Sequence, residues 1–388
     1  MLADLHAHYP MRVVTDLTPR TTFDEMRRIR GRHGRDRLRA LALRIASMVA
    51  SHRDPWSDYR VTPEQMRQGG VGIALSVLYR PGEELGEPYS QPPESRYFGK
   101  LLEDVQDVED EVQTHDPSLI RLVHNRAELD ACPPDATALV HCVEGGFHLG
   151  ALPAEIDANI ETLARKGIAY VTVAHLFHRQ VAKTAPAIPF LRWDWVYNLL
   201  FPQPRHDGLT ERGEATVRSL VSHRVLIDIS HMHPESVAEA VRILDEPGVD
   251  PDCTLPLIAS HAGFRHGRQD YMLDKSTVLE IKRRKGVIGL IMAQYQLNDG
   301  IRRLHTRNFN QSFDVIRRHI DKIAEITGSH EHVAIGTDFD GFIKPTMTGL
   351  ENMGDLALLE ERLQQEYGAD AELITHKNAL RVLQTLWP

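Results

Sequence analysis

The stretch ADLHAHYP (3–10) places two histidines, His6 and His8, one residue apart. In an extended strand the side chains alternate between the two faces, at a rise of ~3.3 Å per residue. His6 and His8 therefore point to the same side, and their imidazoles can converge on one metal ion. Alternatively, the two histidines are ordinary polar residues of a chain terminus. The pair alone does not distinguish a metal site from such a terminus, so we consider the rest of the chain.

Five further residues of the same chemical kind stand at the ends of short apolar runs. They are Glu144, His175, His231, His261 and Asp338. Imidazole and carboxylate groups suit Zn²⁺, with Mn²⁺, Co²⁺ or Fe²⁺ as alternatives.

The candidate ligands are too many for one tetrahedral ion, which predicts two ions per chain. Glu144 has two oxygens and can bridge them, with His6 and His8 on one ion and two later histidines on the other. The second pair is His231 and His261. Water held between two such ions becomes hydroxide near neutral pH.

The elements that must position these residues are eight short apolar runs rich in β-branched residues. They are LADLH (2–6), VGIALSVLY (71–79), TALVHCVE (137–144), AYVTVAH (169–175), VLIDISH (225–231), LPLIASH (255–261), GVIGLIM (286–292) and HVAIGTD (332–338). Such runs are typical of parallel strands buried on both faces. Helix-patterned stretches separate them, for example AEIDANIETLARKG, STVLEIKRRKG and FDVIRRHIDKIAEITG. We therefore predict an α/β fold, a (β/α)8 TIM barrel with a binuclear metal site at the C-terminal ends of its strands, where such barrels place their active sites.

Composition narrows the classes of function. The chain has 388 residues, 42% of them hydrophobic, and a net charge of −9. These values predict one domain over 1–388 with a helical insertion around 11–68, and they argue against nucleic acid as a partner. No apolar run approaches the ~20 residues of a membrane span, and no signal-peptide pattern opens the chain. Three cysteines without metal-type spacing suit a reducing compartment, so we expect a cytoplasmic protein without a membrane partner.

The chain resembles the membrane (renal) dipeptidase family of zinc peptidases over nearly its whole length. The segments that carry the resemblance are DLHAH, RQGGVGIALSVLY, HCVEGG, GIAYVTVAHLF, GLTERGEATVRSL, LIDISHMHPES, IASHAGFRHGRQD and HVAIGTDFDG. The resemblance implies a two-zinc barrel that hydrolyses small dipeptides and a possible homodimer.

The resemblance also implies roles for individual residues. Glu144 would bridge the ions, with His231 and His261 on the second zinc. His175 would contact the scissile carbonyl, and Arg268 would bind the substrate carboxylate. Asp338 would move the proton.

The chain departs from the family pattern at the start. The first family motif ends in His-x-Asp, whereas this chain has His8 in the second position, which raises the net charge of the site by one. A His-x-His start is common among other amidohydrolases, so an enzyme acting on N-acyl amino acids, cyclic amides or lactones is the alternative. A metal-holding but inactive scaffold is a third hypothesis, and Asp338 argues against it because a scaffold needs no proton shuttle.

Overall fold

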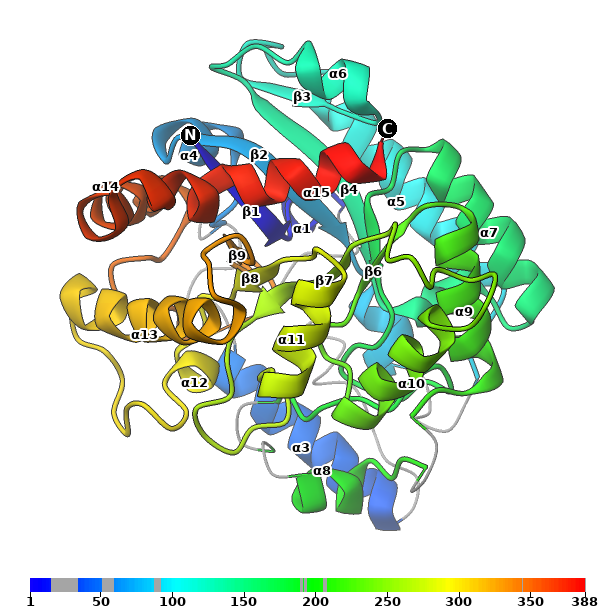
Figure 1. Cartoon of the computed structure of the whole chain (residues 1–388). Coiled ribbons are helices and arrows are strands. Elements are labelled where there is room, and N and C mark those ends of the chain that lie inside the picture. The colour runs from blue at the N-terminus through cyan, green and yellow to red at the C-terminus, as the bar shows by residue number, and fades with distance from the viewer. Residues whose placement is uncertain are drawn as a thin grey trace.

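Nine parallel strands form the centre of the molecule, and helices surround them (Figure 1). The structure is a computed structural model and describes residues 1–14, 34–50, 59–86, 92–188, 191, 194–204, 208–343 and 345–387. The strands are β1 (Leu2–Ala7), β2 (Val71–Leu78), β3 (Ile120–Leu122), β4 (Thr137–Glu144), β5 (Tyr170–Thr172), β6 (Leu226–Asp228), β7 (Leu257–Ala262), β8 (Ile288–Leu290) and β9 (Val333–Ile335).

Eight of these strands close into a barrel. Their order is β2-β1-β9-β8-β7-β6-β5-β4, and the pairing of β2 with β4 completes the ring. Each of the eight coincides with one predicted apolar run, so the predicted (β/α)8 barrel is confirmed. The ninth strand, β3, was not predicted from the sequence, because it is short and only Ile120 in it is fully buried. It pairs with the start of β4, whereas β5 pairs with the end of β4 at Val143 and Glu144.

The helices mostly follow the strands, as the barrel requires. They are α1 (Pro10–Val13), α3 (Gly34–Ala50), α4 (Pro63–Gln68), α5 (Arg96–Val112), α6 (Arg126–Asp130), α7 (Pro153–Arg165), α8 (Asp194–Leu200), α9 (Glu211–Ser222), α10 (Pro234–Leu244), α11 (Lys275–Arg283), α12 (Gln294–Leu297), α13 (Phe309–Thr327), α14 (Leu356–Tyr367) and α15 (Asn378–Leu386). The three helix-patterned stretches quoted above correspond to α7, α11 and α13.

Local sequence explains where these helices begin and end. The Asn308 side chain accepts a hydrogen bond from Gln311 N and caps the start of α13. The same helix ends at Gly328, whose φ of 82° only glycine adopts at little cost. Within the predicted insertion around 11–68, the structure describes the helices α1, α3 and α4 and the non-helical residues 59–62. Residues 15–33 and 51–58 of that insertion lie outside the described residues.

Two apolar layers hold the barrel together. The interior layer contains buried side chains such as Leu5 of β1, Leu75 of β2 and Val140 of β4, together with residues of α15. A larger layer lies between the strands and the surrounding helices. Because the interior is filled with side chains, functional groups are confined to its ends. Among the described residues, no helix combines the length and the apolar character needed to cross a bilayer.

Candidate metal centre

A buried carboxylate, Glu144 at the end of β4, lies at the centre of five histidines. Its oxygens are 3.4 Å from Nε2 of His6, 3.5 Å from Nε2 of His8, 3.4 Å from Nε2 of His175, 3.7 Å from Nε2 of His231 and 3.5 Å from Nε2 of His261. Glu144 is 1% exposed, and the five imidazoles are all buried. The structure thus brings together these six predicted site residues, each from the end of a strand.

The histidines form two groups that could each hold an ion. Glu144, His231 and His261 offer ligand atoms within 4.8 Å of one another. The Nε2 atoms of the two histidines in this group are 2.9 Å apart, so they are close enough to bind the same ion.

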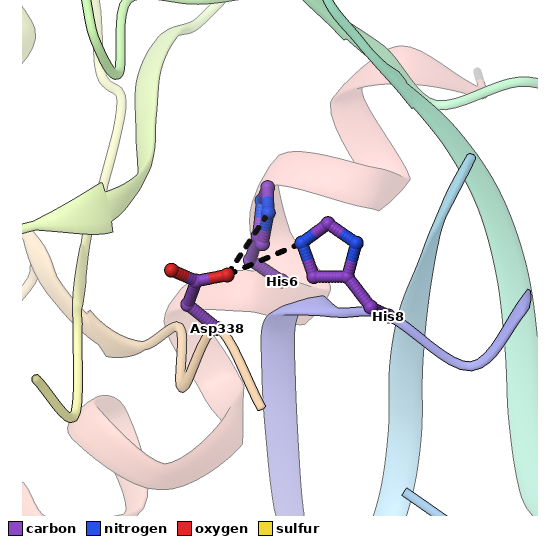
Figure 2. A group of neighbouring side chains, drawn as sticks. All are labelled: His6, His8 and Asp338. Atoms are coloured by element: carbon purple, nitrogen blue, oxygen red, sulfur yellow. Dashed lines mark ion pairs between the residues drawn. The ribbon is translucent and has the colours of Figure 1, made fainter. Parts of the chain in front are cut away.

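The second group consists of His6, His8 and Asp338 (Figure 2). Oδ1 of Asp338 lies 3.2 Å from Nε2 of His8 and 3.9 Å from Nε2 of His6. Burial, followed by the charge of Glu144, raises the pKa of Asp338 well above its ordinary value. This carboxyl group therefore takes up a proton more readily than an exposed aspartate, and it stands within reach of the ligand position.

Divalent metal ions fit this set of donors. In the part of the chain that the structure describes, Nε2 of His6 and Oε1 of Glu144 are buried without a hydrogen-bond partner, and such atoms require a ligand or an ion to compensate their burial. Burial lowers the pKa of His6, His231 and His261 well below the ordinary value, and it lowers that of His8 to about 4. All four imidazoles are then neutral at pH 7, the form that binds a metal ion.

His175 differs from the other four histidines. Its Nδ1 lies 2.6 Å from Oε2 of Glu84, a residue of the turn Gly82–Gly86 after β2. Burial opposes its protonation, but Glu144 and Glu84 outweigh burial and raise the pKa of His175 to about 9. Glu84 is itself held by Tyr79, whose hydroxyl donates to Oε2, and by the Phe177 backbone N–H, which donates to Oε1. His175 is therefore a hydrogen-bond donor or a cation, beside four imidazoles that are neutral.

Two buried aspartates fix the backbone beneath the cluster. Asp4 Oδ1 accepts hydrogen bonds from the N–H groups of His6 and Thr337. Asp228 Oδ1 accepts hydrogen bonds from the N–H groups of Ser230 and Ser260.

These aspartates hold the residues that precede strained positions. Ser230 precedes His231, and Thr337 precedes Asp338. His231 and Asp338 have φ values of 64° and 60°, in the left-handed region that side chains other than glycine rarely adopt. The carboxylates therefore stabilise the turns that point His231 and Asp338 into the site.

Arg268 is the one predicted site residue that the structure places apart from the cluster. It lies in the loop between β7 and α11, where its side chain is exposed and its backbone N–H donates to Asp299. Among the described residues, no hydrogen bond or ion pair joins its guanidinium to the six central residues. Its role toward a substrate carboxylate stays a prediction.

Sequence reasoning missed Glu84, Asp4 and Asp228. For the two aspartates a signal exists: each is a lone charged residue inside an apolar run, LADLH and VLIDISH, where a charge must be fully hydrogen-bonded. No comparable signal marks Glu84, which stands in the short π-helical turn Gly82–Gly86 and contacts His175 only in the folded barrel.

The fold and this cluster together define a metal-dependent hydrolase of the (β/α)8 class. A family model described as membrane dipeptidase (peptidase family M19) matches residues 40–386, so the chain belongs to this family. The predicted resemblance is confirmed, and with it the class of metal-dependent dipeptidases. The matched range begins after β1, so the departure at His8 lies outside it.

Individual relatives agree with this placement. An uncharacterized protein of the pqqA 5′ region of Klebsiella pneumoniae is 25% identical over 281 residues, which cover 70% of this chain and 91% of that protein. An uncharacterized dipeptidase of Schizosaccharomyces pombe is 27% identical over 46% of this chain and 40% of its own length. Among solved structures, a metallopeptidase of Rhodobacter sphaeroides bound to a phosphinate mimic of the dipeptide L-Ala-D-Ala has a TM-score of 0.71 at 17% identity, over 100% of this chain and 99% of that one. A second metallopeptidase, described as a dipeptidase, gives the same TM-score and identity over 100% and 98% of the two chains.

Proposed function

We propose that this protein hydrolyses dipeptides by means of two divalent metal ions bound around Glu144, and that these ions are zinc. The observation that carries the proposal is one buried carboxylate whose two oxygens are surrounded by five imidazole Nε2 atoms within 3.4 to 3.7 Å. His6 and His8 would hold one ion, and His231 and His261 the other. Bound ions would supply an acidified water and would polarise the scissile carbonyl.

The chain's own residues then account for the proton transfers and for substrate orientation. Asp338, with its raised pKa, would take the proton from the attacking water and return it to the leaving amine. His175, held by Glu84, would donate a hydrogen bond to the carbonyl oxygen as negative charge develops on it. Arg268 would bind the free carboxylate of the substrate in a charge-assisted contact.

The substrate class follows from the family and from the chemistry of these residues. A small dipeptide has one scissile amide and one terminal carboxylate, which match the cluster and Arg268 respectively. The Rhodobacter neighbour binds a mimic of an L-D dipeptide, so we propose that dipeptides with either configuration at the second residue are candidates. A homodimer would be consistent with the family resemblance.

One observation favours a second candidate. His8 replaces the anionic residue of the family motif, and this neutral ligand is shared with amidohydrolases that act on N-acyl amino acids, cyclic amides or lactones.

A substrate panel separates the two candidates. The metal-free protein is loaded with Zn²⁺ or Mn²⁺ and assayed on L-L and L-D dipeptides, N-acyl amino acids, cyclic amides and lactones. Turnover of dipeptides supports the proposal, whereas turnover confined to the other classes refutes it. Metal analysis of the same preparation distinguishes a catalyst, with about two equivalents per chain, from an inactive scaffold.

A further inference from the structure

One serine hydroxyl contacts two of the candidate metal ligands at once. Oγ of Ser260, in β7, lies 2.9 Å from Nδ1 of His6 and 2.8 Å from Nδ1 of His261. The two histidines come from different strands and belong to different ligand groups. Ser260 itself is 0% exposed, so water cannot replace its hydrogen bonds.

The direction of these hydrogen bonds is set by Asp228. Ser260 Oγ donates its single proton to Asp228 Oδ2, at 2.6 Å. The hydroxyl oxygen therefore has only lone pairs left, and it can only accept from the two imidazoles. Both histidines must then carry their proton on Nδ1, so Nε2 of each carries a lone pair. Nε2 of His6 has no hydrogen-bond partner among the described residues, and Nε2 of His261 lies 2.9 Å from Nε2 of His231. The Nε2 atoms of His6 and His261 are the ones that face Glu144, at 3.4 and 3.5 Å.

The same geometry excludes an ion between these residues. His6, Asp228 and His261 offer ligand-type atoms close to one another, but the hydroxyl oxygen of Ser260 lies within 2.6 to 2.9 Å of an atom of each. The hydroxyl occupies the position that an ion would need.

We propose that Ser260 is the shared positioning residue of the two metal positions, setting the tautomer and ring orientation of His6 on one side and of His261 on the other. The inference rests on the proposed two-ion site. It predicts that removal of one hydroxyl weakens both ions together, whereas removal of a ligand weakens chiefly its own ion.

Neighbouring hydroxyls supply matched controls. Ser230 Oγ donates to the same Asp228 carboxylate, at 2.8 Å from Oδ1, and accepts a hydrogen bond from the backbone N–H of His261 at 3.2 Å. Within the described residues, no hydrogen bond joins this hydroxyl to an imidazole nitrogen. Tyr170 OH donates to the Leu5 carbonyl and lies 2.8 Å from Nδ1 of His6, and among the described residues it has no hydrogen bond with another ligand imidazole. Within the described part of the chain, the hydroxyls of Ser260, Tyr170 and Ser230 therefore contact two, one and no ligand imidazoles, respectively.

The experiment titrates metal-free protein with Co²⁺ and follows the visible absorption of the bound ion, which needs no substrate. Wild type is expected to take up two equivalents. Ser260→Ala should weaken both binding steps by about 10-fold to 100-fold, the usual cost of losing a partner behind a ligand histidine. Tyr170→Phe should weaken one step, and Ser230→Ala neither. Ser260→Thr, which keeps the hydroxyl, should restore both steps, and Ser260→Cys tests the loss in a side chain of similar size if the alanine variant does not fold.

The outcomes are distinct. If Ser260→Ala and Ser260→Cys weaken only one step, or if Ser230→Ala weakens both as much, the shared role of Ser260 is refuted while the two-ion site stands. If wild type binds fewer than two equivalents, the two-ion proposal itself is refuted. Ring ¹H–¹⁵N spectra of metal-free protein provide a second readout, since Nδ1–H signals of both histidines should be present in wild type and should change in Ser260→Ala.

Discussion

Oε2 of Glu84 lies 2.6 Å from Nδ1 of His175, while Nε2 of the same ring lies 3.4 Å from Oε2 of Glu144. The imidazole is thus held between a carboxylate outside the ligand set and the carboxylate at its centre. This arrangement fixes the ring with one nitrogen directed into the site. It also explains why His175 is the one cluster histidine whose pKa is raised.

Replacing Glu84 by glutamine should lower the pKa of His175, because the neutral amide no longer stabilises the protonated ring. We expect kcat to fall by about 10-fold to 100-fold, and the alkaline limb of the activity profile to move to lower pH. The pH dependence of kcat and KM measures both effects. Glu83→Gln is the control, since Glu83 binds Arg80 and Lys100 instead; an equal shift in that variant would contradict the assignment.

Replacing His8 by alanine should reduce the metal content from about two ions toward one per chain. The reason is that Nε2 of His8 lies beside both Glu144 and Asp338. Elemental analysis after dialysis against a weak chelator measures the loss. His124→Ala serves as a control because that histidine binds Glu128 at the surface. Retention of two ions at unchanged affinity would show that His8 is not a ligand.

Asp338→Asn should preserve the fold, because asparagine tolerates the left-handed φ of 60° at this position. Asparagine cannot accept the proton, so kcat should fall by about 10²–10⁴ with a much smaller change in KM.

The proximity of Asp338 to His6 and His8 leaves a competing role, that of a metal ligand. That role predicts reduced metal content and recovery of activity in excess Zn²⁺, and such recovery would refute the proton shuttle. Asp314→Asn is the control, since the Asp314 carboxylate pairs with Arg317 and Arg318 on α13.

Arg268→Ala should impair hydrolysis of dipeptides far more than that of dipeptide amides, which lack the terminal carboxylate. The expected loss in kcat/KM for dipeptides is about 10-fold or more, as for the loss of a charge-assisted contact. Measuring both substrates on one preparation makes the amide an internal control. Equal losses on the two substrates would mean that the exposed guanidinium serves another purpose.

The metal-free protein should lose stability in mild acid. Burial lowers the pKa of His141 and His319 to about 3 and that of His148 to about 4, all well below the value in an unfolded chain. The unfolded state therefore binds more protons below about pH 6.5. The free energy of unfolding therefore has its full value above that pH. It decreases as the pH falls toward 4, by about 1.4 kcal/mol per pH unit for each histidine.

Urea unfolding of metal-free protein at pH 7.0 and 5.5 measures this effect. In His319→Gln the free energy of unfolding should depend less steeply on pH, because one proton fewer is taken up on unfolding. The wild-type ring is wholly buried between Phe264 N and the Leu297 carbonyl. An unchanged slope in this variant would show that His319 takes up its proton in the folded state.

The sequence alone was sufficient to predict the barrel and the five histidines that meet around Glu144. Parallel strands buried on both faces must be apolar throughout, so a polar residue such as Glu144 or His261 at the end of a run is conspicuous. Glu84 could not be found this way, because its partner His175 is distant in the chain and the contact exists only in the folded barrel. Ser260 was equally hidden, since a serine inside an apolar run carries no charge to mark it.

The hydrogen bond from Thr337 N to Asp4 joins residues 333 positions apart, and β1 pairs with β9 in the same region. The candidate ligands His6 and His8 therefore acquire their neighbour Asp338 only when the last barrel strand is in place. During synthesis, His6 and His8 cannot meet Asp338 before β9 has been made, because Asp338 follows that strand in the sequence. Completion of the proposed metal centre thus requires a closed ring of strands, and bound metal would report that closure.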